Sequence, residues 1–320
     1  MKKTATLFLI ISFCFLNGIA QVQIDAASPT QNTVKNHFGR KGRLSFCWGY
    51  NRAIYSKSDI HITGAGYNFK ITNLAAHDEP APFSTTYIQP TSFSVPQYNY
   101  RLEYFLNDNL FISIGQDHMK YRIYKQTTSL TGYINTDNNG SKNVGNYNNT
   151  EVIVGENDNT NTSLDFSNSN FLKDGFVSNF ENCDGLNDVT AEIGRVMNLW
   201  VANNGKYAIA IMGMLGGGLE IVDTQAEILG YPSTHNYANG KKAYHLAGYS
   251  GSATFCFDFS FCKNFFLQAR LKGGYINLPD INTTIEGGKA SQHFEFLEPI
   301  TMLGYSYAFG NKKESIKKEK

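Results

Sequence analysis

The chain has 320 residues, with 28 basic against 27 acidic side chains, so its formal net charge at pH 7 is +1. A nearly neutral chain lacks the basic surface that nucleic-acid binding requires, which excludes that class of partner. No stretch after the first twenty residues approaches the roughly 18 unbroken apolar residues of a membrane-spanning helix, which excludes helical spans.

The N-terminus has the pattern of a secretory signal peptide. Lys2 and Lys3 precede an apolar run over residues 7–16, and small residues end at Ala20. The run is shorter than the roughly 20 residues that a bilayer span needs. We therefore expect residues 1–20 to be removed by cleavage after Ala20, and residues 21–41 to form an N-terminal periplasmic segment.

Much of the remaining chain alternates between apolar and polar or small residues, as a strand with two different faces does. In the first segment Leu44, Phe46 and Trp48 share one face, and smaller or charged residues occupy the other. Eight such segments follow one another, at residues 43–50, 97–106, 110–123, 188–201, 207–221, 247–261, 265–275 and 297–309.

Two of these segments are irregular. In residues 110–123 the apolar residues change parity between Ile114 and Met119, which predicts a β-bulge there. In residues 188–201 a charged residue, Arg195, stands on the apolar parity.

The connections alternate between short and long. Residues 107–109, 202–206 and 261–264 are short turns, whereas the connections at residues 56–96, 125–187, 223–242 and 279–292 are long or intermediate. Aromatic residues near the strand ends and small or charged opposite faces favour a membrane barrel over its rival, a soluble exported sandwich. We predict an all-β fold, an antiparallel transmembrane β-barrel of eight strands over residues 42–310, with short periplasmic turns and long external loops.

The first and last strands are expected to close this barrel, and residues 311–320 form a basic tail. The asparagine-rich tract at residues 135–163 predicts a mobile external loop, a solvated spacer rather than a recognition surface.

The end of the chain resembles outer-membrane barrels. Residues 303–309 alternate aromatic and small residues and end in Phe309, like the terminal strand that such barrels present to their assembly machinery. Residues 58–61, 76–80, 96–100 and 117–120 are similar to uncharacterised small barrels of the Bacteroidetes type. The resemblance implies an outer-membrane location and a barrel fold, without an established activity.

Charged residues on the inward parity predict an ion-pair network that fills the barrel. They are Arg43, Arg101, Glu103, Asp258, Arg270 and Lys272, with Glu220 nearer a rim. Buried charges need partners, and an eight-stranded barrel is narrow, so a structural network is favoured over a pore lining.

The weak catalytic candidates are His77, Asp78 and His118, because a histidine beside a carboxylate can activate a nucleophile. His118 and its neighbour Asp117 point to opposite faces of a regular strand, which argues against one shared site. We expect no cofactor and no metal, although Asp59 and His61 together with His77 and Asp78 offer possible ligands in the first long connection. The mature cysteines match no metal or redox spacing and are interpreted as structural, which leaves their disulfide status open; they are Cys47, Cys183, Cys256 and Cys262.

These observations favour a structural, adhesive or ligand-binding outer-membrane barrel that acts through its external loops and has a small or closed lumen. A lipid-modifying enzyme is the second hypothesis and a small solute channel the third, and an enzymatic role is less favoured than a non-enzymatic one. The expected partners are outer-membrane lipid, lipopolysaccharide and the barrel assembly machinery, with the external ligand unknown.

Overall fold

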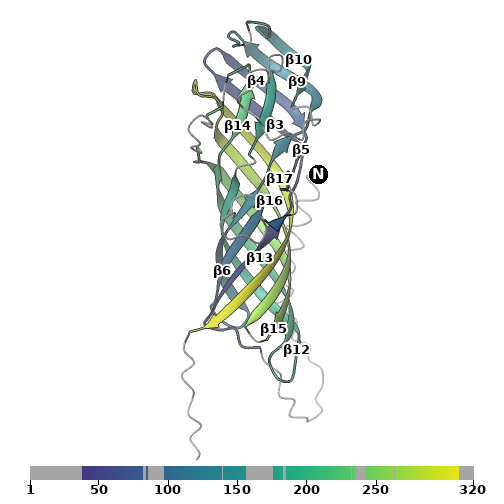
Figure 1. Cartoon of the computed structure of the whole chain (residues 1–320), viewed down its shortest axis with the longest axis vertical. Helices are drawn as coiled ribbons and strands as arrows, with labels where there is room; N and C mark the ends of the chain where they lie inside the picture. Colours follow the sequence, from purple (N-terminus) through teal and green to yellow (C-terminus); the bar gives the residue numbers. More distant parts are fainter. Residues whose placement is uncertain are drawn as a thin grey trace, which may run out of the picture.

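The chain folds as an all-β protein whose strands pair in antiparallel fashion (Figure 1). The computed structural model describes residues 38–81, 84–85, 97–138, 140–155, 176–182, 185–231, 233–234, 243–262 and 264–309. The signal peptide, the basic tail and Cys183 lie outside these residues. Within them, no helix has the length and hydropathy that a membrane crossing would need.

Eight strands close into a ring, and they are the eight segments whose alternation the sequence shows. In ring order they are β1 (Arg43–Asn51), β6 (Tyr98–Phe105), β7 (Leu110–Met119), β12 (Leu186–Val201), β13 (Ala208–Val222), β15 (His245–Phe261), β16 (Phe265–Asn282) and β17 (Lys289–Ala308). The ring closes between the first and last of them, with Arg43 opposite Ala308 and Tyr50 opposite Thr301.

Tight turns lie at one end of the ring, which we call the lower mouth. Between β6 and β7 the side-chain oxygen of Asn107 accepts hydrogen bonds from the backbone N–H groups of Asn109 and Leu110, at 2.9 and 2.8 Å. This is the local bonding that makes asparagine a turn residue. Between β12 and β13, Gly205 adopts a φ of 63°, which favours glycine.

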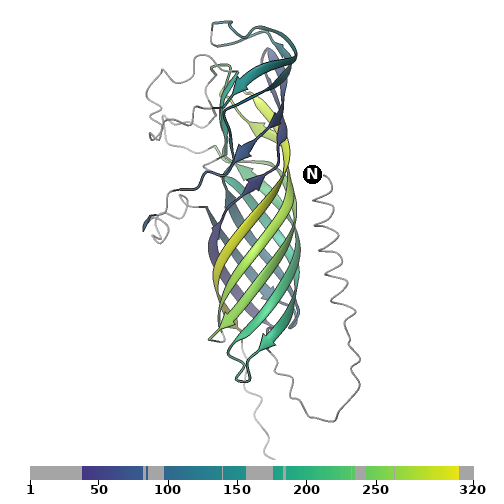
Figure 2. The same cartoon turned by 90° about the vertical axis from the view of Figure 1, so that its right-hand side faces the viewer.

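In the described part of the chain nine further strands lie outside the ring, and together we call them the head. They are β2 (Ile54–Tyr55), β3 (Ser58–Gly64), β4 (Tyr67–Leu74), β5 (Ala76–His77), β8 (Arg122–Ile123), β9 (Gln126–Ile134), β10 (Gly145–Val154), β11 (Val177–Glu181) and β14 (Gln225–Ile228). Figure 2 shows them gathered beyond the end of the ring that is opposite the lower mouth. The prediction of eight strands is therefore correct for the ring and incomplete for the chain.

The head continues the ring because β17 is longer than its partner β1. The upper part of β17 pairs first with β2, where Phe296 lies opposite Tyr55, and then with β3, where Gln292 lies opposite Ile60. The sheet extends from β3 through β4 and β9 to β10, and a separate sheet has the order β14-β11-β8-β5.

The asparagine-rich tract at residues 135–163 was wrongly predicted as a solvated spacer over residues 145–154. Residues 145–154 form β10, which pairs with β9, and Val152 and Val154 are buried. Two apolar residues on one face are enough here because the head supplies a core for them. Residues 156–163 of the tract lie outside the described residues.

The bulge predicted in residues 110–123 is absent, because β7 pairs with β6 and β12 without a register shift. The parity changes for another reason. The strand ends at Met119, and Tyr121 and Ile123 then enter the apolar core of the head. The connection predicted at residues 279–292 is also shorter, since β16 runs to Asn282 and β17 begins at Lys289.

Candidate functional site

The interior of the ring carries the densest group of charged residues in the described chain, and it is arranged in layers from the lower mouth to the head. Outward positions of the strands are apolar, so each inward position on the opposite parity faces the lumen. All six predicted lumen charges are there, each with 7% or less of its surface exposed.

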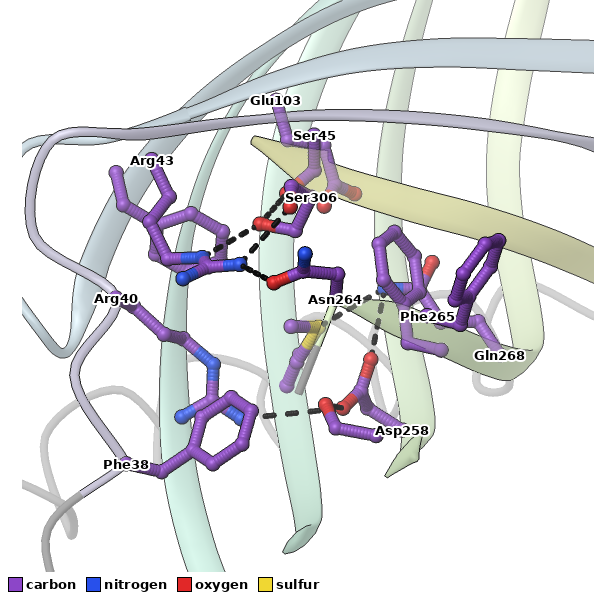
Figure 3. A pocket seen from close by; sticks show the side chains of 14 residues that line it. Phe38, Arg40, Arg43, Ser45, Glu103, Asp258, Asn264, Phe265, Gln268 and Ser306 are labelled. Carbon is purple, nitrogen blue, oxygen red and sulfur yellow. Dashed lines mark hydrogen bonds and ion pairs between the residues drawn. The ribbon is translucent and has the colours of Figure 1, made fainter. Parts of the chain in front are cut away.

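The lower mouth is closed by the segment that precedes β1 (Figure 3). The Arg40 guanidinium enters the ring, donates from Nη1 to Asn198 Oδ1 at 2.5 Å, and lies 3.8 Å from an Asp258 carboxylate oxygen. Phe38 lies beneath it, with the guanidinium carbon 4.7 Å from the ring centre. The space left at this end is about 20 Å³, which is room for a single water molecule.

Arg43 and Asp258 form hydrogen bonds with neighbouring side chains at the same level of the ring. Arg43 donates from Nε to Ser306 Oγ and from Nη2 to Asn264 Oδ1, both at 2.9 Å. Asp258 accepts from Ser260 Oγ at 2.9 Å and from Gln268 Nε2 at 3.1 Å. These hydrogen bonds therefore connect neighbouring strands and leave few free donors or acceptors for a ligand at the lower mouth.

The middle layer joins two arginines to two glutamates across the lumen. Arg270 pairs with Glu103, and Arg101 Nε lies 3.2 Å from Glu192 Oε2. Both arginine side chains and both glutamate side chains are 1% exposed. Sulfur atoms lie beside these pairs: the Cys47 sulfur is 3.9 Å from Arg270 Nη2 and 3.8 Å from the sulfur of Met302.

The upper layer is centred on Lys272. Its Nζ lies 2.6 Å from a carboxylate oxygen of Asp117 and 2.6 Å from one of Asp188. Arg101 reaches the same Asp117 oxygen at 2.6 Å. Two further carboxyl groups are buried at this level: Glu220, which lies opposite Asp188 in the sheet, and Glu298. This layer is the most acidic part of the lumen.

Five members of the network were not predicted to be lumen charges. Asp117, Asp188, Glu192 and Glu298 occupy inward positions, and the alternation of their strands is the signal that could have identified them. Arg40 could not have been identified, because it precedes β1 and belongs to no periodic pattern.

The predicted catalytic residues do not assemble into one site. His118 is buried in the upper ring, where its Nδ1 lies 2.8 Å from Asn187 Oδ1 and its ring stacks on Tyr98. His77 lies in β5 of the head and contacts the ring of Tyr124, with the ring centres 4.4 Å apart. The neighbouring Asp117 belongs to the lumen network, so the two faces of β7 separate it from His118 as expected.

Asp78 also has a structural environment. Its Oδ2 accepts from the backbone N–H of Ala53 at 3.3 Å and lies 3.6 Å from the Arg52 guanidinium. Burial raises the pKa of Asp78 above the usual range, and these two contacts only partly oppose that change.

The possible metal ligands of the first long connection are likewise dispersed. Asp59 is bound by Lys70 at 2.7 Å, and His61 Nε2 lies 2.7 Å from Asn68 Oδ1. Among the described residues no three His, Cys, Asp or Glu side chains gather in a way that could hold a metal ion. Cys47 and Cys256 are buried free thiols inside the ring, and Cys262 is an exposed one in the turn after β15.

An apolar cluster of the head closes the upper end of the ring. It joins residues of the head, such as Phe69 and Phe180, to the upper ends of ring strands, such as Ile276 and Phe294. At its centre Tyr121 stacks on Phe294 and hydrogen-bonds Ser58 and Gln292. Burial raises the pKa of Tyr121 to about 12, so its phenol stays neutral.

No protein-family model matches the sequence, and no curated protein matches it either. Solved structures with a similar arrangement include Ail, the attachment invasion locus protein of Yersinia pestis, at 12% identity and a TM-score of 0.29, with 83% of this chain and 99% of that chain covered. They also include the outer membrane protein OprG of Pseudomonas aeruginosa, at 10% identity and a TM-score of 0.36, with 85% and 98% covered. The outer membrane protein AlkL, determined in lipid bilayers, matches at 6% identity and a TM-score of 0.32, with 90% and 98% covered. At TM-scores below 0.5 these likenesses carry no argument about function.

Proposed function

We propose that this chain is an outer-membrane barrel protein whose closed ring anchors the folded head on the outer side of the membrane. The head then serves a structural, adhesive or ligand-binding role. The observation that carries this proposal is the outward face of the ring, which presents apolar side chains on every ring strand while the inside is charged.

The outward face exposes large apolar side chains on every ring strand. Ile114 and Ile193 are 60% and 53% exposed on one side of the ring, and Phe255 and Leu303 are 42% and 54% exposed on strands of the other side. A water-soluble protein rarely exposes a contiguous apolar surface of this extent. A bilayer, in contrast, would cover it and make the exposure favourable.

Aromatic residues mark both edges of this apolar band. Near the lower mouth Phe265 lies against Tyr305, with ring centres 5.1 Å apart. Toward the head, Tyr100 donates from its hydroxyl to Gln116 at 3.1 Å, and Tyr249 and Tyr275 are also exposed. Aromatic residues are enriched at the two interfaces of a membrane with water. Their position at both edges of the apolar band therefore supports a ring that is embedded in a membrane.

The orientation of the ring in the membrane follows from the different lengths of the connections at its two ends. Membrane barrels have short turns on the periplasmic side and their longer connections outside. The lower mouth carries the tight turns, and the long connections form the head, so we place the lower mouth in the periplasm. The terminal strand β17 then ends on the periplasmic side, where an assembly machinery would meet it.

Both ends of the lumen are filled, so the ring is not expected to conduct. Wild-type protein inserted into planar bilayers should give no stable current steps, with a porin-type barrel as the positive control for insertion. No current is expected because three features block the lumen: the Arg40 side chain at the lower mouth, the ion pairs of the middle layer and the apolar cluster above them. Large, stable conductance steps would contradict the proposal and favour the solute-channel alternative.

The alternative of a lipid-modifying enzyme has no geometric support among the described residues. His77 and His118 lie in different elements and contact different partners. The resemblance to Bacteroidetes-type barrels and the proposed membrane partners remain part of this proposal.

A further inference from the structure

One charged residue, Arg195, interrupts the apolar outward face. Between the level of Tyr249 and Tyr275 and the lower turns, the other outward positions on the described ring strands are uncharged. Arg195 is half-buried, and its side chain makes no ion pair with any described residue. A guanidinium on a lipid-facing wall is costly unless it meets a charge of opposite sign.

A groove begins directly above this arginine on the outside of the ring. On its own strand the next outward residue toward the head is Ile193, and on the two flanking strands the corresponding residues are Ile112 and Leu215. Arg195 lies opposite Leu110 and Gly213, one outward position below those two residues. Ile193, Ile112 and Leu215 all line the groove. Successive outward residues are about 7 Å apart along a strand, so the charge stands at the foot of the groove.

The groove has the size and lining of an acyl-chain site. Its volume is about 720 Å³, within the roughly 300–1,000 Å³ of typical ligand pockets. Leu102 and Ile114 form part of its wall, while Ala191 and Gly217, which are cross-strand neighbours, keep it open. Small residues at paired positions on an otherwise bulky wall leave a furrow on the outward face.

We propose that this groove is a specific site for one anionic glycerophospholipid of the periplasmic leaflet. An acyl chain occupies the furrow between Ile114 and Leu215, and the headgroup phosphate meets Arg195. Arginine binds phosphate through two parallel N–H donors, which a lysine cannot reproduce in geometry although it keeps the charge. The one carboxylate residue that lines the groove, Glu192, is buried and ion-paired with Arg101, so it does not attract a cationic headgroup and an anionic lipid is favoured over a zwitterionic one. This inference rests on the proposed membrane location.

The test measures phospholipid retained by the full mature chain, purified in mild detergent, by native mass spectrometry with added phosphatidylglycerol or phosphatidylcholine. Wild type should retain one phosphatidylglycerol in preference to phosphatidylcholine. Arg195→Met should weaken this binding about fivefold, the size expected for one basic residue near an anionic headgroup. Arg195→Lys should retain part of the preference.

A matched pair of substitutions tests the furrow itself. Ala191→Leu fills the groove and should abolish retention, because Ala191 lines it. Ala269→Leu makes the same change at an exposed outward position on β16 that does not line the groove, and it should leave binding unchanged. Heat-modifiable gel mobility shows in each case that the ring is folded.

The possible failures are distinguishable. Equal retention of both lipids by wild type, or equal loss in Ala191→Leu and Ala269→Leu, would overturn the lipid site in a protein that still inserts into vesicles. A wild-type chain that does not insert into vesicles at all would overturn the membrane location on which the site rests.

Discussion

Replacing Lys272 with methionine is expected to cost about 3–5 kcal/mol of unfolding free energy, the range measured when one partner of a buried ion pair is removed. The Lys272 ammonium is fully buried and lies 2.6 Å from both Asp117 and Asp188. Without it, the most acidic layer of the lumen keeps its carboxylates and loses the cation at its centre. The midpoint of urea unfolding in detergent micelles, read from heat-modifiable gel mobility, measures the effect.

Lys289 provides the matched control. It also lies 2.6 Å from a carboxylate, that of Asp280, but the two side chains are 45% and 60% exposed. Lys289→Met should therefore cost no more than about 1 kcal/mol. In the Lys272→Met background, Asp188→Asn should recover part of the stability, because it removes one of the uncompensated charges. If both lysine variants unfold at the same urea concentration, the network does not stabilise the ring as described.

The second large effect is expected in the head. Tyr121→Ala should destabilise it by about 3–5 kcal/mol, as truncation of a buried aromatic residue does. The substitution removes the stacking on Phe294 and leaves Ser58 and Gln292 without the hydroxyl that they contact. We expect proteases to cut the head while the ring keeps its heat-modifiable mobility. The hydrogen bonds between the ring strands do not involve Tyr121, which lies outside those strands.

Two further variants separate packing from hydrogen bonding. Tyr121→Phe keeps the ring stack and should cost about 1–3 kcal/mol, the penalty for unsatisfied buried polar groups. Tyr133→Ala removes the same side chain from an exposed position on β9, where 41% of its surface is accessible, and should leave protease resistance nearly unchanged. Cleavage of the head at the same rate in Tyr121→Ala and Tyr133→Ala would show that the apolar cluster does not hold the head together.

The ring could be predicted from sequence because each of its strands has an apolar outward face and a polar or small inward face. In β15 the outward Phe255, Phe257 and Phe259 alternate with the buried Cys256 and Asp258, and the period of two is visible without knowledge of any partner. The turn at Asn107 is equally local, since its side chain bonds the next residues of the chain.

The head could not be predicted in the same way, since its strands depend on distant partners. Leu130 and Val152 are buried only because β9 and β10 join a core that also contains Phe294 and Val222 from the ring. Within β10 itself, the apolar residues are confined to one end and asparagines dominate the other. From sequence alone the segment is therefore predicted as a solvated loop, because the distant residues that bury its apolar end are not visible in its own pattern.

The lumen charges illustrate the same division. Parity shows that Arg101 and Glu103 face inward, but not which acid each base meets across the ring. Arg101 pairs with Asp117 on a neighbouring strand and with Glu192 farther around the ring, whereas Glu103 pairs with Arg270 on β16, which lies three strands away in the other direction. These pairings depend on the stagger of the closed ring, which no single strand encodes.

The most direct test of an embedded ring with an external head is the accessibility of spin labels, attached to single introduced cysteines, to oxygen and to a water-soluble nickel complex. Cys262, the exposed native cysteine in the described residues, and Cys183, which lies outside them, are both replaced by serine in this background. Labels at the outward ring positions Leu303 and Ala269 should collide with oxygen and be shielded from nickel in lipid vesicles. A label at Ile153, which is 60% exposed in the head, should show the reverse. Nickel access at positions 303 and 269 equal to that at position 153 would contradict a membrane-spanning ring.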